Sequence, residues 1–180
     1  LGSALYKSLF ANEQPKVSLL NVGSEEIKGT ETLKKTFKRL SNLSGENNFL
    51  FKGYIEGNQI MSGDSNVIIT DGFTGNIALK TAEGTSNFIT SELKKALSST
   101  LIGKFSSLLN YRGLKKFKKK LDPRLYNGAI LLGLDKPVIK SHGSTDSTGF
   151  ANSLMVCEKI IRGKLIDQIN WAMVENPKHL

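Results

Sequence analysis

Short apolar runs alternate with segments of helical periodicity along most of the chain. The apolar runs predict strands at about 17–20, 48–55, 66–70, 129–132 and 137–140. Apolar residues at helical spacing predict helices at about 32–43 and 148–173. Strands that alternate with helices are typical of a mostly parallel sheet covered by helices. The pattern therefore predicts an α/β fold.

The segment from Gly84 to Lys120 is longer than a crossover helix requires. Apolar residues recur there at every third or fourth position, namely at Ile89, Leu93, Leu97, Leu101, Phe105 and Leu108. This spacing indicates a helix with one apolar face. A turn at 110–113 then precedes a short basic helix at 114–121. We expect residues 84–121 to form a pair of helices that projects from the sheet.

The positive charge of the chain is concentrated in this same segment. The net charge is +9, and nine basic residues without an intervening acidic residue lie between positions 94 and 120. They are Lys94, Lys95, Lys104, Arg112, Lys115, Lys116, Lys118, Lys119 and Lys120. The remainder of the chain is therefore close to neutral. A local basic surface implies an anionic partner, which can be a protein, a lipid headgroup or a nucleic acid.

Length and composition exclude several classes of protein. The 180 residues suit one domain with an apolar core, and no apolar run reaches the roughly 20 residues of a membrane span. A single cysteine, Cys157, excludes an internal disulfide framework and a thiolate-rich metal site. The two histidines, His142 and His179, lie far apart in the sequence, so we expect no metal site to be built from them. This composition fits a reducing, cytoplasmic setting.

Three predicted strand-to-helix loops carry glycines and small polar residues. They are residues 21–29 (NVGSEEIKG), 71–76 (DGFTGN) and 141–146 (SHGSTD). Glycines let the backbone approach an anion closely, and the free N–H groups of a helix's first turn bind phosphate oxygens. Each loop alone can be ordinary turn or capping chemistry. Together they predict an anion site at one edge of one sheet, where parallel strands end.

A few side chains in these loops could carry chemistry. His142 could donate a hydrogen bond to phosphate or act as a general acid–base, or could be tied to a neighbouring carbonyl. Lys80 and Lys28 could neutralise a phosphate or an oxyanion, or be solvated surface residues. Asp71 could cap a helix or orient a neighbouring donor. The chain shows neither a serine nucleophile elbow nor a Walker A loop.

These loops resemble one protein family. Residues 21–29 are similar to the N-(I/V)-G-x-E-x-x-K-G stretch of the bacterial phosphate acyltransferases of phospholipid synthesis, the PlsX family. Residues 71–76, followed by Leu79 and Lys80, resemble the most recognisable motif of that family. Residues 128–134 and 138–144 resemble its G-A-x-L-L-G and K-x-H-G-x-S/T segments. The three matches occur in the family's order and cover about 2–165 of the chain.

The resemblance implies a fold and a reaction. Family members are roughly twice as long, so residues 1–180 are expected to be the C-terminal half of a single phosphate acyltransferase domain. The implied fold is a three-layer α/β/α sandwich, similar to isocitrate dehydrogenases and phosphotransacetylases, in a homodimer. The implied reaction transfers a fatty acyl group from an acyl carrier protein thioester to inorganic phosphate and yields acyl-phosphate for phospholipid synthesis. No cofactor or metal is implied.

The resemblance also suggests roles for individual residues. We expect His142, Lys80 and Asn76 to be catalytic. The remaining loop residues are expected to bind phosphate or to shape the carbonyl site, and they are Gly23, Lys28, Asp71, Gly72, Phe73, Gly75, Gly143 and Ser144. Glycine loops and lysines would hold two negative species together and stabilise an oxyanion. The phosphate itself would be the nucleophile.

The basic helical segment fits more than one partner. The nine basic residues at 94–120 suit an acidic carrier protein or the inner face of an anionic cell membrane, touched peripherally. Alternatively, the apolar stripe packs in a dimer and leaves the lysines solvated. A phosphotransacetylase that uses acyl-coenzyme A is the nearest rival function. A nucleic-acid-binding or non-catalytic module is the rival from another class, but only two aromatics, Tyr111 and Phe117, accompany the lysines. We therefore expect no nucleic-acid partner.

Overall fold

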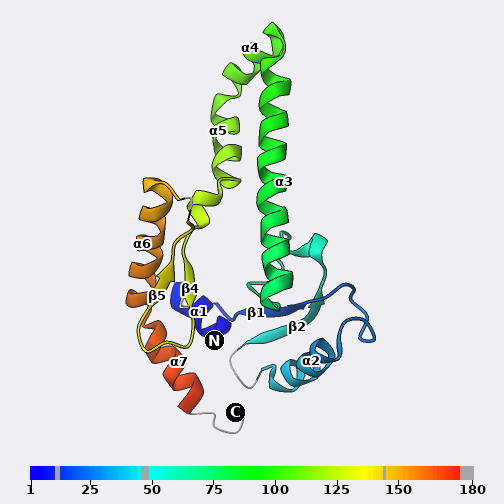
Figure 1. Cartoon of the computed structure of the whole chain (residues 1–180), viewed down its shortest axis with the longest axis vertical. Coiled ribbons are helices and arrows are strands. Elements are labelled where there is room, and N and C mark those ends of the chain that lie inside the picture. The colour runs from blue at the N-terminus through cyan, green and yellow to red at the C-terminus, as the bar shows by residue number, and fades with distance from the viewer. Residues whose placement is uncertain (11–12, 46–48, 144, 175–180) are drawn as a thin grey trace. The chain divides into compact units, whose positions relative to one another are not determined.

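The computed structural model describes residues 1–10, 13–45, 49–143 and 145–174, with side chains up to Asn170. The chain folds as two compact units (Figure 1). The first unit comprises Leu1–Asp71, Ala129–Lys140 and the chain from Leu154 onward. The second unit comprises Gly72–Gly128 and Ser141–Ser153. Each unit is described on its own below.

The first unit contains a parallel three-stranded sheet. Strand β1 (Lys16–Leu20) lies between β2 (Leu50–Ile55) and β3 (Val67–Ile69), and both pairings are parallel. β1 is buried because it is the central strand. Helix α2 (Glu31–Leu43) connects β1 to β2, and a 3-10 turn, η1 (Gly57–Gln59), follows β2. The predicted α/β class, three of the predicted strands and the helix at 32–43 are confirmed.

The strands at 129–132 and 137–140 do not join this sheet. β4 (Ala129–Leu131) and β5 (Val138–Lys140) form a separate antiparallel pair. Only six residues connect them, whereas a parallel pair needs a crossover of a dozen or more residues. β5 is also mostly exposed, since Val138 and Lys140 are exposed and Ile139 is half-buried. The expectation that all three loops follow strands of one sheet is therefore wrong for the loop at 141–146.

The predicted helix at 148–173 is two helices. α6 (Ser147–Arg162) ends at Gly163, and α7 (Leu165–Val174) begins two residues later, after Lys164 at φ 51°. The residues at this junction pack against α1 (Gly2–Leu9), and a methyl group at Gly163 would lie only 2.0 Å from the Ser8 carbonyl oxygen. Residue 163 must therefore be glycine, because only a residue without a side chain lets the junction and α1 approach so closely.

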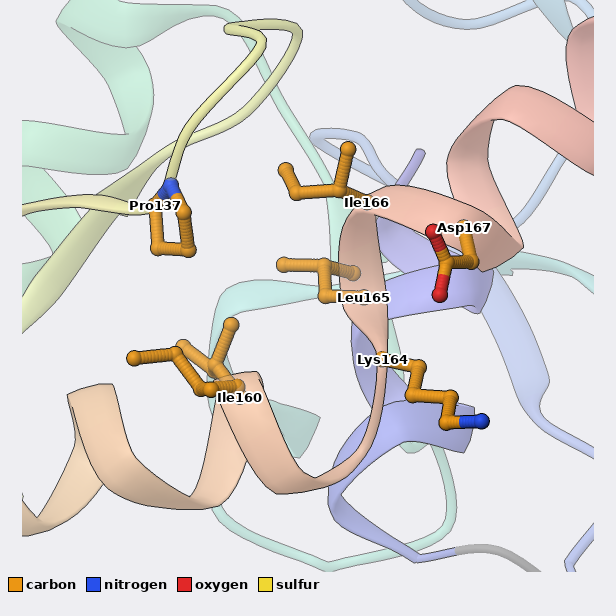
Figure 2. A pocket seen from close by; sticks show the side chains of 7 residues that line it. Pro137, Ile160, Lys164, Leu165, Ile166 and Asp167 are labelled. Atoms are coloured by element: carbon orange, nitrogen blue, oxygen red, sulfur yellow. The ribbon is translucent and has the colours of Figure 1, made fainter.

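An apolar core forms around this junction in the first unit. Its buried members are Ala4, Ile160, Leu165 and Ile169, and half-buried residues of β4 and β5 pack against them. Nearby is a hollow of about 200 Å³ (Figure 2) in which Ile160, Leu165 and Ile166 face Pro137. Small-molecule sites usually enclose about 300–1,000 Å³ and combine apolar walls with converging polar groups. This shallow hollow contains none of the predicted site residues.

The second unit consists mainly of helices. They are α3 (Gly72–Ser98), α4 (Leu101–Leu109), α5 (Tyr111–Lys120) and the 3-10 helix η2 (Pro123–Tyr126). Figure 1 shows the long α3 in green, followed by α4 and α5. The predicted helix pair at 84–121 is wrong in detail, because an additional break occurs at Ser99 and Thr100. Thr100 caps α4 there, with its Oγ1 accepting a hydrogen bond from the Gly103 N–H at 3.0 Å.

Two further features of the helices bear on function. α3 begins at Gly72, so most of the predicted loop at 71–76 is the first helical turn and the start of the second. Gly72 and Phe73 therefore lie at the positive end of the dipole of a 27-residue helix, where negative charge is stabilised.

Among the described residues, no helix combines the length and the apolar character that crossing a membrane would require.

Candidate active site

Lys80 and His142 meet in the second unit. The Lys80 Nζ lies 3.2 Å from the His142 Nε2, although the two residues are 62 positions apart in the sequence. Lys80 lies in the third turn of α3, and His142 follows β5 in the loop that precedes α6. Both side chains are exposed, so an anion could reach them from solvent. Two of the three predicted catalytic residues are therefore brought into direct contact.

The contact constrains the chemistry of the imidazole. A lysine ammonium group has three donors and no acceptor, so beside it the His142 Nε2 must accept the hydrogen bond. A hydrogen bond in this direction corresponds to the tautomer with its ring proton on Nδ1. The same ammonium group donates to the Glu83 Oε2 at 2.8 Å, one turn further along α3. The site thus joins an ammonium group, an imidazole and a carboxylate.

The start of α3 provides anion-binding potential on the same helix. Gly72, Phe73, Gly75 and Asn76 all lie in its first two turns, and Phe73 is largely exposed. Asn76 and Lys80 are four residues apart and so share a face of the helix. Lys80 lies roughly 12 Å along the axis from Gly72 at 1.5 Å per residue, and lysine side chains lean towards the N-terminus. Asp71 directly precedes the helix, and its carbonyl accepts a hydrogen bond from the Thr70 hydroxyl at 3.2 Å.

The predicted loop at 21–29 belongs to the first unit. Its Lys28 Nζ contacts the Glu25 Oε1 at 2.7 Å, and a methyl group at Gly23 would lie 2.5 Å from the Lys28 side chain. A hydrogen bond from the ammonium group lowers the pKa of Glu25 and raises the pKa of Lys28. Asn21 closes the loop by donating from Nδ2 to the Lys28 carbonyl at 3.1 Å. Lys28 therefore has a carboxylate partner, whereas we predicted it as a phosphate ligand.

The loop at 141–146 presents His142 and Gly143 at the surface. The predicted Ser144 lies outside the described residues. The loop is held by side chains that the sequence reasoning did not select, namely Asn127 and Arg124. Glu83 was also missed. The spacing of Lys80 and Glu83 at i and i+3 on one helix could have suggested their ion pair. Within the described residues, no group of three or more histidine, cysteine or acidic side chains is placed to hold a metal ion.

The nine predicted basic contact residues are all exposed. Lys94 and Lys95 lie on α3, Lys104 on α4, and Arg112, Lys115, Lys116, Lys118, Lys119 and Lys120 on α5. Lys95 contacts the Glu92 Oε1 at 2.6 Å, and Lys115 lies 6.0 Å above the Tyr111 ring. Large apolar side chains are exposed on the neighbouring α4, and they are Leu101, Ile102, Phe105, Leu108 and Leu109. Exposed apolar groups of this extent indicate an interaction surface.

Comparison with known proteins identifies the family. The family described as "Fatty acid synthesis protein" matches residues 1–167. The chain belongs to this family. The phosphate acyltransferase of Pelagibacter ubique (strain HTCC1062) is 66% identical over 169 residues, which are 94% of this chain and 50% of that protein. The phosphate acyltransferases of Neisseria meningitidis and Azorhizobium caulinodans are 47% and 45% identical over 176 residues, 97% of this chain and 49% of each protein.

The match to the phosphate acyltransferase family confirms the resemblance seen in the loop motifs. It includes all three motif segments as well as Lys80 and His142. The chain spans about half the length of the curated relatives it matches. The roles of individual site residues remain predictions.

Proposed function

We propose that the protein transfers a fatty acyl group from an acyl carrier protein thioester to inorganic phosphate. A phosphate oxygen attacks the thioester carbonyl, the C–O bond forms, and the C–S bond breaks. The carrier leaves as a thiol after its thiolate takes up the proton that the phosphate loses. Phosphate is the nucleophile, so the chain need supply no covalent catalyst. The products are acyl-phosphate and the free carrier protein.

The contact between Lys80 and His142 is the observation that carries this proposal. A reaction between an anionic nucleophile and a carbonyl requires charge neutralisation and a group that can handle one proton. Lys80 supplies the positive charge. His142 takes up the phosphate proton on Nε2 and passes it to the thiolate, once the bound phosphate replaces Nε2 as the acceptor of the Lys80 ammonium group. The start of α3 adds the positive end of the helix dipole, which favours phosphate oxygens. Family membership supports phosphate and an acyl donor as substrates.

Acyl-phosphate formation is the direct test. The complete protein is incubated with a long-chain acyl carrier protein and phosphate, and acyl-phosphate is trapped with hydroxylamine and quantified. We expect product that depends on both substrates. The matched reaction replaces the carrier thioester with acyl-coenzyme A. Product from acyl-coenzyme A alone would contradict the carrier protein as donor and favour the phosphotransacetylase alternative.

The basic and apolar surface of α4 and α5 supports a second part of the proposal. We propose that this surface holds the acidic carrier protein and contacts the anionic inner face of the cell membrane. The lysines supply long-range attraction, and the exposed apolar side chains of α4 can enter the interfacial region. We also propose a cytoplasmic homodimer with an α/β/α sandwich fold, as in the family resemblance, in which residues 84–121 form the projecting segment.

Replacing lysines on α5 provides a test of this surface. We expect Lys115, Lys116 and Lys119 changed together to Gln to weaken binding to anionic lipid vesicles at least about tenfold, since each lysine near such a surface contributes about 1 kcal/mol. Sedimentation with vesicles of anionic and of neutral lipid measures the effect. Lys34, Lys35 and Lys38 on α2, changed together to Gln, are the matched control. Equal binding by both variants to vesicles and to the carrier protein would contradict an electrostatic role for α5.

A further inference from the structure

One amide side chain joins the loop around His142 to the segment before β4. The Asn127 Oδ1 accepts a hydrogen bond from the His142 backbone N–H at 2.9 Å. The Asn127 Nδ2 faces three acceptors, which are the Ser141 Oγ at 2.8 Å, the Thr145 Oγ1 at 2.9 Å and the Gly149 carbonyl at 3.0 Å. Asn127 is half-buried and is 14–22 residues from these partners in the sequence. One side chain thus spans the loop from its start to the first turn of α6.

The hydrogen-bonding capacity of this amide is fully used. An asparagine amide has two N–H donors, so the three acceptors share two hydrogens. The buried Ser153 adds a hydroxyl that lies 3.2 Å from the Ser141 Oγ and 3.1 Å from the Gly149 carbonyl. A methyl group at Gly149 would lie 2.1 Å from the Thr145 Oγ1, so no side chain fits at that position. The loop is therefore held from several sides around Asn127.

A second link ties the far end of the loop to the same segment. Arg124 donates to the Asp146 Oδ2 at 2.7 Å, and its other guanidinium nitrogens contact Asp122 at 2.7 to 3.2 Å. The pKa of Asp146 is lowered mainly by a hydrogen bond from the Gly149 N–H. The hydrogen bond from the Arg124 guanidinium lowers this pKa further. Arg124 likewise lowers the pKa of Asp122. Both carboxylates are consequently charged at neutral pH, which keeps this end of the loop in place.

We infer that Asn127 is a positioning residue that sets the His142 imidazole against Lys80. This inference rests on the proposed function. Asn127 acts on the His142 backbone and on the hydroxyl groups of Ser141 and Thr145, and its hydrogen bonds go to these residues and to Gly149, not to Lys80. Arg124 holds Asp146, four residues beyond His142, whereas Asn127 bonds to the histidine itself. Asn127 therefore affects catalysis through the position of the imidazole.

The expected size of the effect follows from geometry. The His142 side chain is exposed, and the hydrogen bond of its backbone N–H to Asn127 ties it to the segment before β4. Without the amide, the N–H loses its acceptor and the Ser141 and Thr145 hydroxyls lose a common donor. A misplacement of about 1 Å at a reacting group can reduce a rate by about 10²-fold. We therefore expect Asn127→Ala to lower kcat/KM for phosphate by about 10- to 100-fold.

The test is a double-mutant cycle in the complete protein. Asn127→Ala, His142→Ala and the double variant are compared in acyl-phosphate formation. Because Asn127 acts through His142, we expect its substitution to change kcat/KM by less than about twofold once His142 is alanine. Asn152→Ala is the matched control, since its Nδ2 donates to the Arg124 and Thr148 carbonyls at 3.3 and 3.0 Å without contacting the loop start. We expect Asn152→Ala to retain wild-type kcat/KM.

The outcomes separate this inference from the proposed function. Multiplicative effects of Asn127→Ala and His142→Ala, or an equal loss in Asn152→Ala, would overturn the positioning role. Loss of the fold is monitored by thermal unfolding of each variant, and kinetic constants are referred to the folded fraction. If the wild-type protein forms no acyl-phosphate, the proposed function fails. In that case the positioning role of Asn127 is tested by titration calorimetry with phosphate alone. An unchanged affinity of Asn127→Ala for phosphate, relative to the wild-type protein, would overturn the inference.

Discussion

Lys80→Ala is expected to lower kcat/KM for phosphate by about 10²–10³-fold in acyl-phosphate formation, the usual cost of removing one group that stabilises developing negative charge. The Lys80 ammonium group is a cation in direct contact with the His142 imidazole, with 3.2 Å between Nζ and Nε2. Its removal leaves phosphate and the tetrahedral intermediate without this charge. Steady-state kinetics with varied phosphate, at a saturating concentration of the acyl carrier protein thioester, would measure the change.

The control variants for Lys80→Ala change a lysine at another position, or change the group at position 80 or its carboxylate partner. Lys136→Ala removes an exposed lysine from the first unit and is expected to keep full activity. Lys80→Arg keeps the charge but not the shape of the ammonium group, so we expect intermediate activity. Glu83→Gln removes the carboxylate at 2.8 Å from Nζ while leaving the lysine in place. Wild-type kinetics in Lys80→Ala would show that Lys80 is a surface residue and would remove the central support of the proposed function.

Gly163→Ala is expected to destabilise the protein by about 3 kcal/mol, near the upper end of the usual overpacking range. The added methyl group would lie 2.0 Å from the Ser8 carbonyl oxygen and 2.7 Å from its carbonyl carbon. Both atoms belong to the backbone of α1, so rotation of a side chain cannot relieve the clash. For a chain of this size the loss corresponds to a decrease in Tm of roughly 6–12 °C. Thermal unfolding followed by circular dichroism would measure it.

Gly84→Ala is the matched control and is expected to act in the opposite direction. Gly84 lies inside α3, is exposed, and has no atom within 4 Å of the position that a methyl group would take. Replacing a helical glycine by alanine without a clash stabilises a protein by about 0.5–1 kcal/mol. An unchanged Tm in Gly163→Ala would contradict the close packing of the α6–α7 junction on α1.

The candidate site was only partly predictable from the sequence. Lys80 was selected because it follows the glycine-containing motif at 71–76, and His142 because it lies within the loop at 141–146, but their contact across 62 residues was not visible. Glu83 was missed although its spacing from Lys80 is a local signal. Asn127 and Arg124 gave little local signal, since an asparagine before a glycine reads as ordinary turn chemistry. Their importance depends on partners in the loop at 141–146 and at the start of α6, which are distant in the sequence.

The sequence by itself determined the α/β class, the family, and most strands and helices, because apolar periodicity and motif spacing are local properties of the chain. Tertiary structure alone decided that the α6–α7 junction packs on α1, because the Ser8 carbonyl that excludes a side chain at Gly163 comes from the other end of the chain. It also decided that His142 meets Lys80 beside α3. Such contacts depend on how distant segments pack, which hydrophobic periodicity does not encode.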